Sequence, residues 1–527
     1  IERLALCGSD YSATALSPYL SNTKLYNVAL ATITSIGTDK AAKVIFKALK
    51  TSDDVTIKPS LIHALGNLRF VPAATYIQEL TAADSIITQQ FALMALSEIA
   101  PVTAMEKLTE AANNANYTLD DSNAILALIN YGNRLKEKGE VELSKAVGKL
   151  LLKNCTAENQ LHFRAAGIHL LRENNEANFI KTLLKEAKHT NAAYRGAVFI
   201  AAAQNITDVE VAKWAKAYKK MSTDAKPQLL RLLQNSNETI VFEKCIVPAI
   251  HDTNEQVSIA GIKSLAFQSK EKALPLLLKL VANSKNKVKT TSIKETLLRV
   301  SSLEDGAILA SNLEKSTIEG KKVLVEVLAA KRASANFTEV LDLLNLKDET
   351  LNTVIFEALP QLAATEHLSE IVTLLTSENN PTNIKNIQKA IVTTIDASEK
   401  DHSELIFNTY NTIQNNEVLL PVLPVLNNDK ALELVAVSLN SNNKKQQLEA
   451  LKALANWRTN SALPHLFTAV TSLNDSELKS TAFNNYLVQV RNSSYPDDQK
   501  LLLFKKLMPL ANTVDAQKSV LNNIGNV

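Results

Sequence analysis

The chain has 527 residues, of which 46% are hydrophobic and 21% are charged. This balance excludes a mainly disordered or membrane-embedded chain, and the formal net charge of +3 is too small to indicate nucleic acid or an anionic membrane as the main partner. Only 12 glycines and 14 prolines are available for turns, so we expect helices nearly throughout.

One spacing recurs along the chain. A residue, usually apolar, is followed at +3, +4 and +8 by mostly small or aliphatic residues, which places all four on one helical face. The intervals between the matches indicate a step of about 31 to 32 residues, a length typical of the helical hairpins of solenoids. The matches are Leu25-Val28-Ala29-Ile33, Ile57-Ser60-Leu61-Leu65, Phe163-Ala166-Gly167-Leu171, Tyr194-Ala197-Val198-Ala202, Val257-Ala260-Gly261-Leu265 and Leu351-Val354-Ile355-Leu359.

Each such helix needs an apolar partner across a short polar link. Suitable partners are Ala41–Leu49, Ala273–Val281 and Phe337–Leu344. The small residues Gly167 and Gly261 predict close helix contacts, because helices approach closely only where side chains are short. No linker or low-complexity stretch interrupts the pattern, so residues 1–527 are predicted to form a single continuous array.

The predicted links between helices are rich in Asn, Asp, Ser and Thr. These side chains cap helices with an oxygen atom and tolerate tight turns. Asn doublets are interpreted as helix junctions. They occur at Asn113-Asn114, Asn174-Asn175, Asn379-Asn380, Asn415-Asn416, Asn427-Asn428 and Asn442-Asn443.

The segment Val102–Leu151 departs from the regular pattern. Two polar stretches, Asn113–Tyr117 and Lys136–Glu140, are expected to lengthen its links and make this repeat bulge. Inserted loops often carry function. Tyr131 and Arg134 are therefore the candidate surface-binding residues.

The two ends of the chain predict a fragment of a longer protein. The chain begins with Ile1 instead of Met, and Ile1–Gly8 has the pattern of the last turns of a second helix whose first helix is missing, so missing N-terminal residues are expected. Val514–Ile524 completes a helix and Gly525 is a suitable helix stop, after which a C-terminal domain could follow.

The sequence contains no recognisable catalytic, cofactor-binding or metal-binding motif. Cys7, Cys155 and Cys245 lack the paired spacing of disulfides or zinc sites and are interpreted as small buried side chains. The eight histidines show no metal-ligand spacing, and no glycine-rich nucleotide loop occurs. Trp214 and Trp457 lie in helical segments, where a packing role is expected. We predict no cofactor, no metal and no catalytic residue in this chain.

The pattern resembles HEAT repeats, whose second helix carries an apolar residue, often an adjacent Arg, and then small residues. Phe163-Arg164-Ala165-Ala166 and Tyr194-Arg195-Gly196-Ala197 follow this order. The resemblance covers essentially the whole chain. The predicted fold class is all-α, an α-solenoid (superhelix) of about 16 HEAT-like helical hairpins.

Three segments also resemble a narrower group, large secreted bacterial proteins in which a HEAT solenoid accompanies a lectin-like 3-keto-disaccharide hydrolase domain. The resemblance implies an upstream signal peptide, a periplasmic or cell-surface location, and a role in processing oxidised sugars or plant glycosides. The catalytic β-sandwich of that family is not in this chain, so no hydrolase residue is assigned. The segments are Ala15–Leu20 with Ala29–Ile33, Ala64–Arg69 with Pro72–Ala74, and Leu151–Gln160.

Two functional hypotheses follow. In the first, the chain is a non-catalytic scaffold whose concave face binds a protein partner or presents an attached domain, without nucleic acid binding or membrane insertion. In the second, it is the non-catalytic portion of a glycoside-processing 3-keto-disaccharide hydrolase whose active site lies outside residues 1–527. A third interpretation, a bilin-lyase-like HEAT protein, lacks a suitably placed cysteine or acidic cluster.

Overall fold

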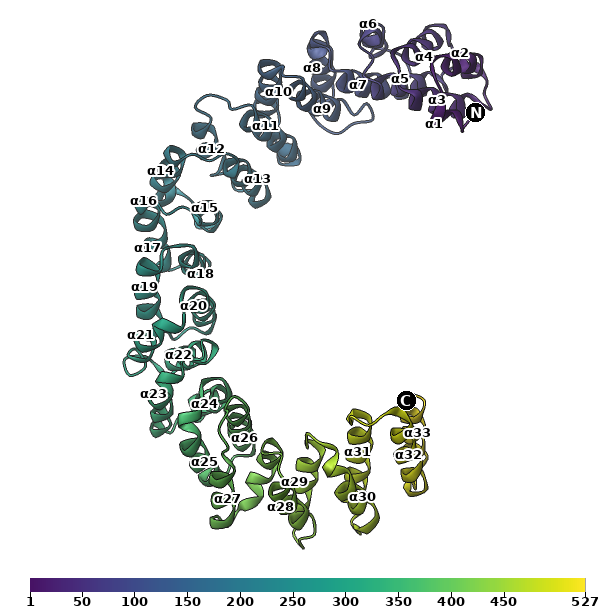
Figure 1. Ribbon diagram of the computed structural model, residues 1–527. Helices are drawn as coiled ribbons and strands as arrows, with labels where there is room; N and C mark the ends of the chain where they lie inside the picture. The colour runs from purple at the N-terminus through teal and green to yellow at the C-terminus, as the bar shows by residue number, and fades with distance from the viewer. Residues whose placement is uncertain (527) are drawn as a thin grey trace. The chain divides into compact units, whose positions relative to one another are not determined.

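The computed structural model describes residues 1–526, and every regular element in that range is helical (Figure 1). The chain divides into two compact units, Ile1–Gln268 and Ser269–Val527, of which Val527 itself lies outside the described residues. Each unit contains eight helical pairs, so the described part of the chain contains sixteen. The all-α solenoid predicted from the repeat period is confirmed, and the continuity of the array from one unit to the next stays a prediction.

The first unit consists of two layers of helices (Figure 1). It opens with the short helix α1 (Leu4–Cys7), which packs on α3. The first helices of the pairs are α2 (Asp10–Leu16), α4 (Asp39–Thr51), α6 (Ala74–Leu80), α8 (Met105–Asn114), α10 (Val141–Asn154), α12 (Ile180–Glu186), α14 (Asp208–Ala217) and the interrupted helix α16 (Thr239–Val241), η6 (Phe242–Ile246, a π-turn) and α17 (Val247–Ile250). The second helices are α3 (Tyr26–Ile36), α5 (Lys58–Asn67), α7 (Ile86–Ile99), α9 (Ala124–Glu137), α11 (Leu161–Glu173), α13 (Ala192–Ala203), α15 (Lys226–Leu233) and α18 (Glu255–Ser264).

The second unit repeats this arrangement. Its first helices are α19 (Lys270–Ala282), α21 (Gly306–Ala310), α23 (Phe337–Leu341), α25 (Leu368–Ser377), α27 (Ser403–Thr412), α28 (Asp429–Leu439), α30 (Leu463–Ser472) and α32 (Asp497–Leu507). Its second helices are α20 (Lys287–Val300), α22 (Ile318–Ala330), α24 (Glu349–Leu362), α26 (Pro381–Asp396), the 3-10 helix η12 (Asn416–Val425), α29 (Lys444–Ala455), α31 (Ser476–Asn492) and α33 (Val514–Ile524). Helix α33 is the helix that the sequence predicts there.

Short 3-10 turns extend or precede many first helices. In the first unit they are η1 (Ser17–Ser21), η2 (Val71–Ala73), η3 (Val102–Ala104), η4 (Glu158–Gln160), η5 (Tyr218–Lys220) and η7 (Leu265–Phe267). In the second unit they are η8 (Leu303–Asp305), η9 (Ser334–Asn336), η10 (Asp342–Leu346), η11 (Thr365–His367), η13 (Asn460–Ala462) and η14 (Met508–Leu510).

The repeated spacing marks the core face of the second helices. The residues at the start, +4 and +8 are buried in all six matches, except that Leu25 at the start of the first match is 38% exposed. The residues at +3 are partly exposed in every match. The stripe at +4 and +8 therefore faces the core, whereas the +3 position lies at its edge.

The Asn doublets lie at helix junctions, as predicted. The side chain of Asn380 accepts a hydrogen bond from the Thr382 amide at 2.9 Å and so caps α26. Asn428 and Asn443 cap α28 and α29 in the same way. These bonds satisfy amides that the first helical turn leaves without an intrahelical partner.

Two glycines allow the close helix contacts that the sequence predicts. A Cβ atom on Gly167 of α11 would lie 2.8 Å from the carbonyl oxygen of Gly148 on α10. A Cβ atom on Gly261 of α18 would lie 2.7 Å from both the Ala249 Cβ and the Ile250 backbone nitrogen on α17. Larger residues at these positions would force the paired helices apart.

Both tryptophans are buried, so the predicted packing role is confirmed. Trp214 is fully buried on α14 and packs near Phe199, with ring centroids 5.5 Å apart. Cys155 and Cys245 are buried as predicted, but Cys7 is exposed. The prediction was wrong for Cys7 because α1 is short and buries none of its residues.

Candidate functional site

The segment predicted to be irregular contains one long link. Helix α8 ends at Asn114 and α9 begins at Ala124, which leaves residues 115–123 as a loop. The second expected lengthening was wrong, because Lys136 and Glu137 continue α9 and only residues 138–140 separate it from α10. The irregularity therefore lies on one side of α9 only.

The base of this loop is anchored to the core and to the next hairpin. Tyr117 is only 6% exposed, and its amide donates to the Ala112 carbonyl at 2.8 Å. The side-chain amide of Gln160 donates to the Asn116 carbonyl at 2.8 Å. Asn116 and Tyr117 both adopt positive φ angles of 52°, a conformation that costs energy for residues other than glycine. The hydrogen bonds to Ala112 and Gln160 hold Asn116 and Tyr117 in this conformation.

The end of the loop is fixed by a second set of bonds. The Ser122 hydroxyl donates to the Asp120 carboxylate, with oxygen–oxygen distances of 2.8 and 2.9 Å. The same hydroxyl accepts from the Ala124 amide at 3.2 Å, where α9 begins. The Asn123 amide donates to the Asp120 carbonyl at 3.1 Å. The loop is thus ordered at both ends.

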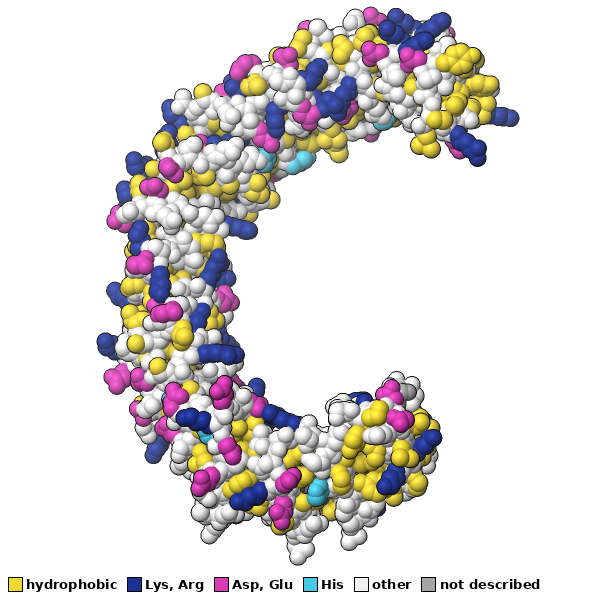
Figure 2. Space-filling view, in the orientation of Figure 1, with side chains coloured by type: hydrophobic (Ala, Val, Ile, Leu, Met, Phe, Trp, Pro, Cys, Tyr) yellow, Lys and Arg dark blue, Asp and Glu magenta, His cyan; other side chains and the backbone are white. Residues whose placement is uncertain are grey.

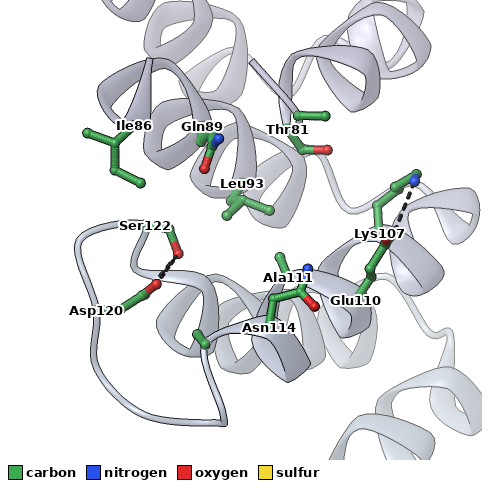
Figure 3. Close-up of a pocket in the computed structure, with 12 residues that line it drawn as sticks. Thr81, Ile86, Gln89, Leu93, Lys107, Glu110, Ala111, Asn114, Asp120 and Ser122 are labelled. Atoms are coloured by element: carbon green, nitrogen blue, oxygen red, sulfur yellow. Dashed lines mark hydrogen bonds and ion pairs between the residues drawn. The ribbon is translucent and has the colours of Figure 1, made fainter. Parts of the chain in front are cut away.

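A groove runs along this loop, and we call it the loop groove. It consists of two adjoining pockets of about 320 and 520 Å³, and Ile86 and Asp120 line both of them. Figure 3 shows the first pocket, with Gln89 and Leu93 of α7 facing Ala111 and Asn114 of α8 and the loop closing one side. The second pocket is lined by Ile86, Ile87, Gln90, Leu119, Asp120, Asp121 and Asn123.

Three aliphatic side chains stand exposed around the loop groove. Ile86 is 45%, Ile87 54% and Leu119 64% exposed. Ser85 caps α7 by accepting from the Thr88 amide at 3.4 Å, and the core face of α7 starts at Thr88. The two isoleucines therefore lie in the first turn of α7, before its core-facing stripe begins. A group of exposed aliphatic residues is typical of an interaction surface.

The charge around the loop groove is mainly negative. Asp84, Asp120 and Asp121 are exposed, and within residues 1–526 none of them forms an ion pair with a lysine or arginine. The lysine of the groove, Lys107, pairs with Glu110 at 3.0 Å, so these two charges largely cancel. Elsewhere, Figure 2 shows acidic and basic side chains interspersed on the visible face of each unit.

Tyr131, a predicted surface-binding residue, is buried. Its exposed fraction is 0%, and its hydroxyl donates to the Pro101 carbonyl at 2.8 Å. Burial raises the pKa of Tyr131 to about 12. The surface placement was wrong because the ring lies on the core face of α9, and the hydroxyl satisfies a carbonyl just beyond the end of α7.

Arg134, the other predicted residue, is also mostly covered, with a side chain 11% exposed. Its guanidinium pairs with Glu137 on its own helix and lies 3.8 Å from the Glu98 carboxylate on α7. The structure brings Tyr131 and Arg134 together at the ends of α7 and α9, away from the residues that line the loop groove. Both side chains join neighbouring hairpins.

The sequence pattern marks the irregular segment Val102–Leu151, but the exposed aliphatic residues of the loop groove were not predicted. The available signal was the doublet Ile86-Ile87, which follows the helix cap Ser85 and adds apolar residues outside the core stripe. A second signal was Leu119, an aliphatic residue inside a link that is otherwise polar near its end.

A buried polar cluster lies further along the first unit and follows the Arg positions of the repeat. Arg164 donates two hydrogen bonds to the Glu186 carboxylate, at 2.8 and 2.9 Å, and Tyr194 donates a third at 2.7 Å. Burial alone would raise the pKa of Glu186, but these bonds outweigh it and hold that pKa below its usual value. Its charges are paired with each other and covered, and its bonds join α11, α12 and α13, which belong to two successive helical pairs.

A third pocket lies in the second unit, between α31 and α33. Its volume is about 470 Å³, and Phe483, Leu510 and Asp515 are among its lining residues. Among residues 1–526, no three His, Cys, Asp or Glu side chains are grouped closely enough to hold a metal ion.

None of the helices formed by the described residues combines the length and the apolar character that crossing a bilayer requires.

No protein-family model matches the sequence, and a search of curated proteins finds no relative. Among solved structures, the chain is similar to Kap121p bound to Ste12p, with 10% identity, a TM-score of 0.37, and coverage of 98% of this chain and 64% of that chain. It is also similar to yeast importin-beta (Kap95p), with 13% identity, a TM-score of 0.35, and coverage of 98% and 84%. A third similar structure is the S. pombe condensin Cnd3-Cnd2 subcomplex, with 12% identity, a TM-score of 0.30, and coverage of 97% of this chain and 80% of that chain. The chain thus spans 64% of the first of these proteins, and similarity at this level indicates nothing about ligands.

Proposed function

We propose that this chain is a non-catalytic scaffold that binds a segment of a partner protein in the loop groove. The observation that carries the proposal is the group of exposed aliphatic side chains, Ile86, Ile87 and Leu119, around a groove whose loop is already ordered. Covering exposed aliphatic surface is favourable by about 25 cal/mol per Å². A partner gains this energy without having to order the loop.

The shape of the loop groove supports an elongated ligand. Its two pockets adjoin at Ile86 and Asp120, which line both of them. A peptide segment can pass between the two pockets and occupy both, whereas a compact small molecule would fill only one. Binding of a protein on a concave face lined by one helix of each pair is a separate prediction.

The narrower hypotheses rest on the sequence resemblance. We propose on that basis that the chain belongs to an exported bacterial protein of the periplasm or cell surface. The alternative proposal adds a glycoside-processing hydrolase domain elsewhere in the same polypeptide. The encoded sequence before Ile1 and after Val527 tests both, because a signal peptide supports export and a β-sandwich with clustered acid and base residues supports the hydrolase.

A peptide-display experiment tests the binding site. A library of short random peptides is selected on the wild-type chain and then measured on the double variant Ile87→Asp/Leu119→Asp. Ile200→Asp is the matched control, because Ile200 is 64% exposed on α13 of the same unit, outside the lining of the loop groove. We expect a set of peptides that loses binding on the double variant and keeps it on the control. Selected peptides that bind all three proteins equally would refute the loop groove as the site.

A further inference from the structure

We propose that the segment bound in the loop groove carries aliphatic residues flanked by lysine or arginine. This inference rests on the proposed function and adds the chemistry of the partner. It follows from the juxtaposition of two features of the groove, its aliphatic side chains and its carboxylates without ion-pair partners.

Two carboxylates without ion-pair partners line the loop groove, and a third lies close to it in the sequence. Asp120 lines both pockets, and Asp121 lines the second pocket, as Leu119 does. Asp84 is exposed in the link that precedes α7, two residues before Ile86. A segment whose aliphatic side chains contact Ile87 and Leu119 therefore has its neighbouring residues close to acidic side chains.

These carboxylates are available to a partner. Asp120 accepts a hydrogen bond from Ser122, which orders its carboxylate but leaves its charge uncompensated. Across residues 1–526 neither Asp120 nor Asp121 has a lysine or arginine within ion-pair distance. The one cation of the groove, Lys107, is already paired with Glu110 at 3.0 Å. A cationic segment would therefore meet negative charge without displacing an existing ion pair at Asp120 or Asp121.

The same charges disfavour other classes of ligand. Phosphate groups of nucleic acid or of an anionic membrane would be repelled by Asp120 and Asp121. An acidic peptide would bring like charges together, which costs affinity and slows association. Charge complementarity thus selects a basic segment, while Ile86, Ile87 and Leu119 supply the apolar contact.

The test uses the peptides that depend on the loop groove, as identified with Ile87→Asp/Leu119→Asp. Their sequences are expected to be enriched in lysine and arginine next to leucine, isoleucine or valine. Affinity is then measured by fluorescence anisotropy on Asp120→Asn/Asp121→Asn. The control is Asp497→Asn/Asp498→Asn, an exposed aspartate doublet at the start of α32 in the other unit. Asparagine keeps the shape of aspartate, and circular dichroism verifies that each variant is folded.

We expect the Asp120→Asn/Asp121→Asn variant to bind these peptides about 2-fold to 30-fold more weakly, which is the range for the loss of two exposed ion pairs. The control variant should bind like wild type. Added salt should weaken wild-type binding more than binding to the variant, because salt screens exposed charges.

Groove-dependent peptides that are neutral or acidic, or that bind Asp120→Asn/Asp121→Asn as tightly as wild type, would overturn the inference and leave the proposed function standing. A selection that yields no groove-dependent peptide would overturn both. Sedimentation would reveal a different occupant, a second copy of this chain, if the wild type self-associates and Ile87→Asp/Leu119→Asp does not. That result would also overturn the inference.

Discussion

Replacement of Gly261 by alanine tests the close packing on which the repeat depends. The added methyl group would lie 2.7 Å from the Ile250 backbone nitrogen and 2.9 Å from the Ala249 carbonyl carbon. These are backbone atoms, so α17 and α18 must move apart. Overpacking of this kind costs about 1 to 3 kcal/mol, whereas the better helix propensity of alanine returns about 1 kcal/mol. The net expectation is a loss of stability of about 0 to 2 kcal/mol.

Gly196 of α13 is the matched control. The nearest neighbour of its added methyl group is the Gln228 side-chain nitrogen at 3.7 Å, an ordinary contact distance. Gly196→Ala should therefore stabilise its helix by about 1 kcal/mol through propensity alone. The difference between the two variants isolates the packing cost, which should be about 1 to 3 kcal/mol.

Hydrogen exchange of peptides from α13 and from α17–α18 measures how each substitution changes the local stability of its own helices. A local method is needed because the stability of a repeat protein is a sum over hairpins and their neighbours. Gly261→Ala should speed exchange around α17–α18 and leave distant hairpins unchanged, while Gly196→Ala should slow exchange in α13. Equal stabilisation by both substitutions would refute the close contact between α17 and α18.

Three further predictions concern the polar bonds between hairpins. Tyr131→Phe removes the donor to the Pro101 carbonyl and should lower the local stability of α7–α9, measured by hydrogen exchange, by about 1 kcal/mol. Because Tyr131 lies outside the loop groove, peptide binding there should not change. Glu186→Gln removes the negative charge that compensates Arg164. A broken buried pair typically costs about 3 to 5 kcal/mol, so hydrogen exchange in α11–α13 should become much faster. Unchanged protection there would show that the pair does not stabilise these helices. In the folded chain the pKa of Glu186 lies below the ordinary value of a glutamate. The stabilisation by ionised Glu186 is therefore present at neutral pH and is lost as the pH falls through that lowered pKa. The acid-induced loss of protection in α11–α13 should be absent from Glu186→Gln.

The fold could be predicted because its main determinant is local. Burial at +4 and +8 follows from helix geometry within one turn of each starting residue, so Ala29 and Ile33, or Ile355 and Leu359, identify a core face without knowledge of the partner helix. Close contacts at Gly167 and Gly261 could be predicted for the same reason. The exact partner of each glycine could not, since it depends on how two helices cross.

The burial of Tyr131 could not be predicted, because the role of its side chain depends on a distant backbone atom. Tyr131 was interpreted as a surface residue, yet its hydroxyl partner is a carbonyl 30 residues earlier in the chain. Similar bonds recur where Lys331 donates to the Leu298 carbonyl and Gln489 to the Ala455 carbonyl. A carbonyl partner leaves no sequence signature, because every residue has one.

The order of the 115–123 loop bears directly on how tightly the groove can bind. Ordering nine residues costs about 9 to 18 kcal/mol of backbone entropy at about 1 to 2 kcal/mol each, similar to the roughly 12 kcal/mol of a nanomolar complex. A disordered loop would therefore leave little net affinity. In this chain Tyr117, Gln160 and Ser122 hold the loop in place before any partner binds. The entropy of ordering the loop is therefore lost on folding and does not reduce the affinity. Gln160 belongs to the next hairpin, and the affinity of the groove consequently depends on the packing of a neighbouring repeat that does not line it.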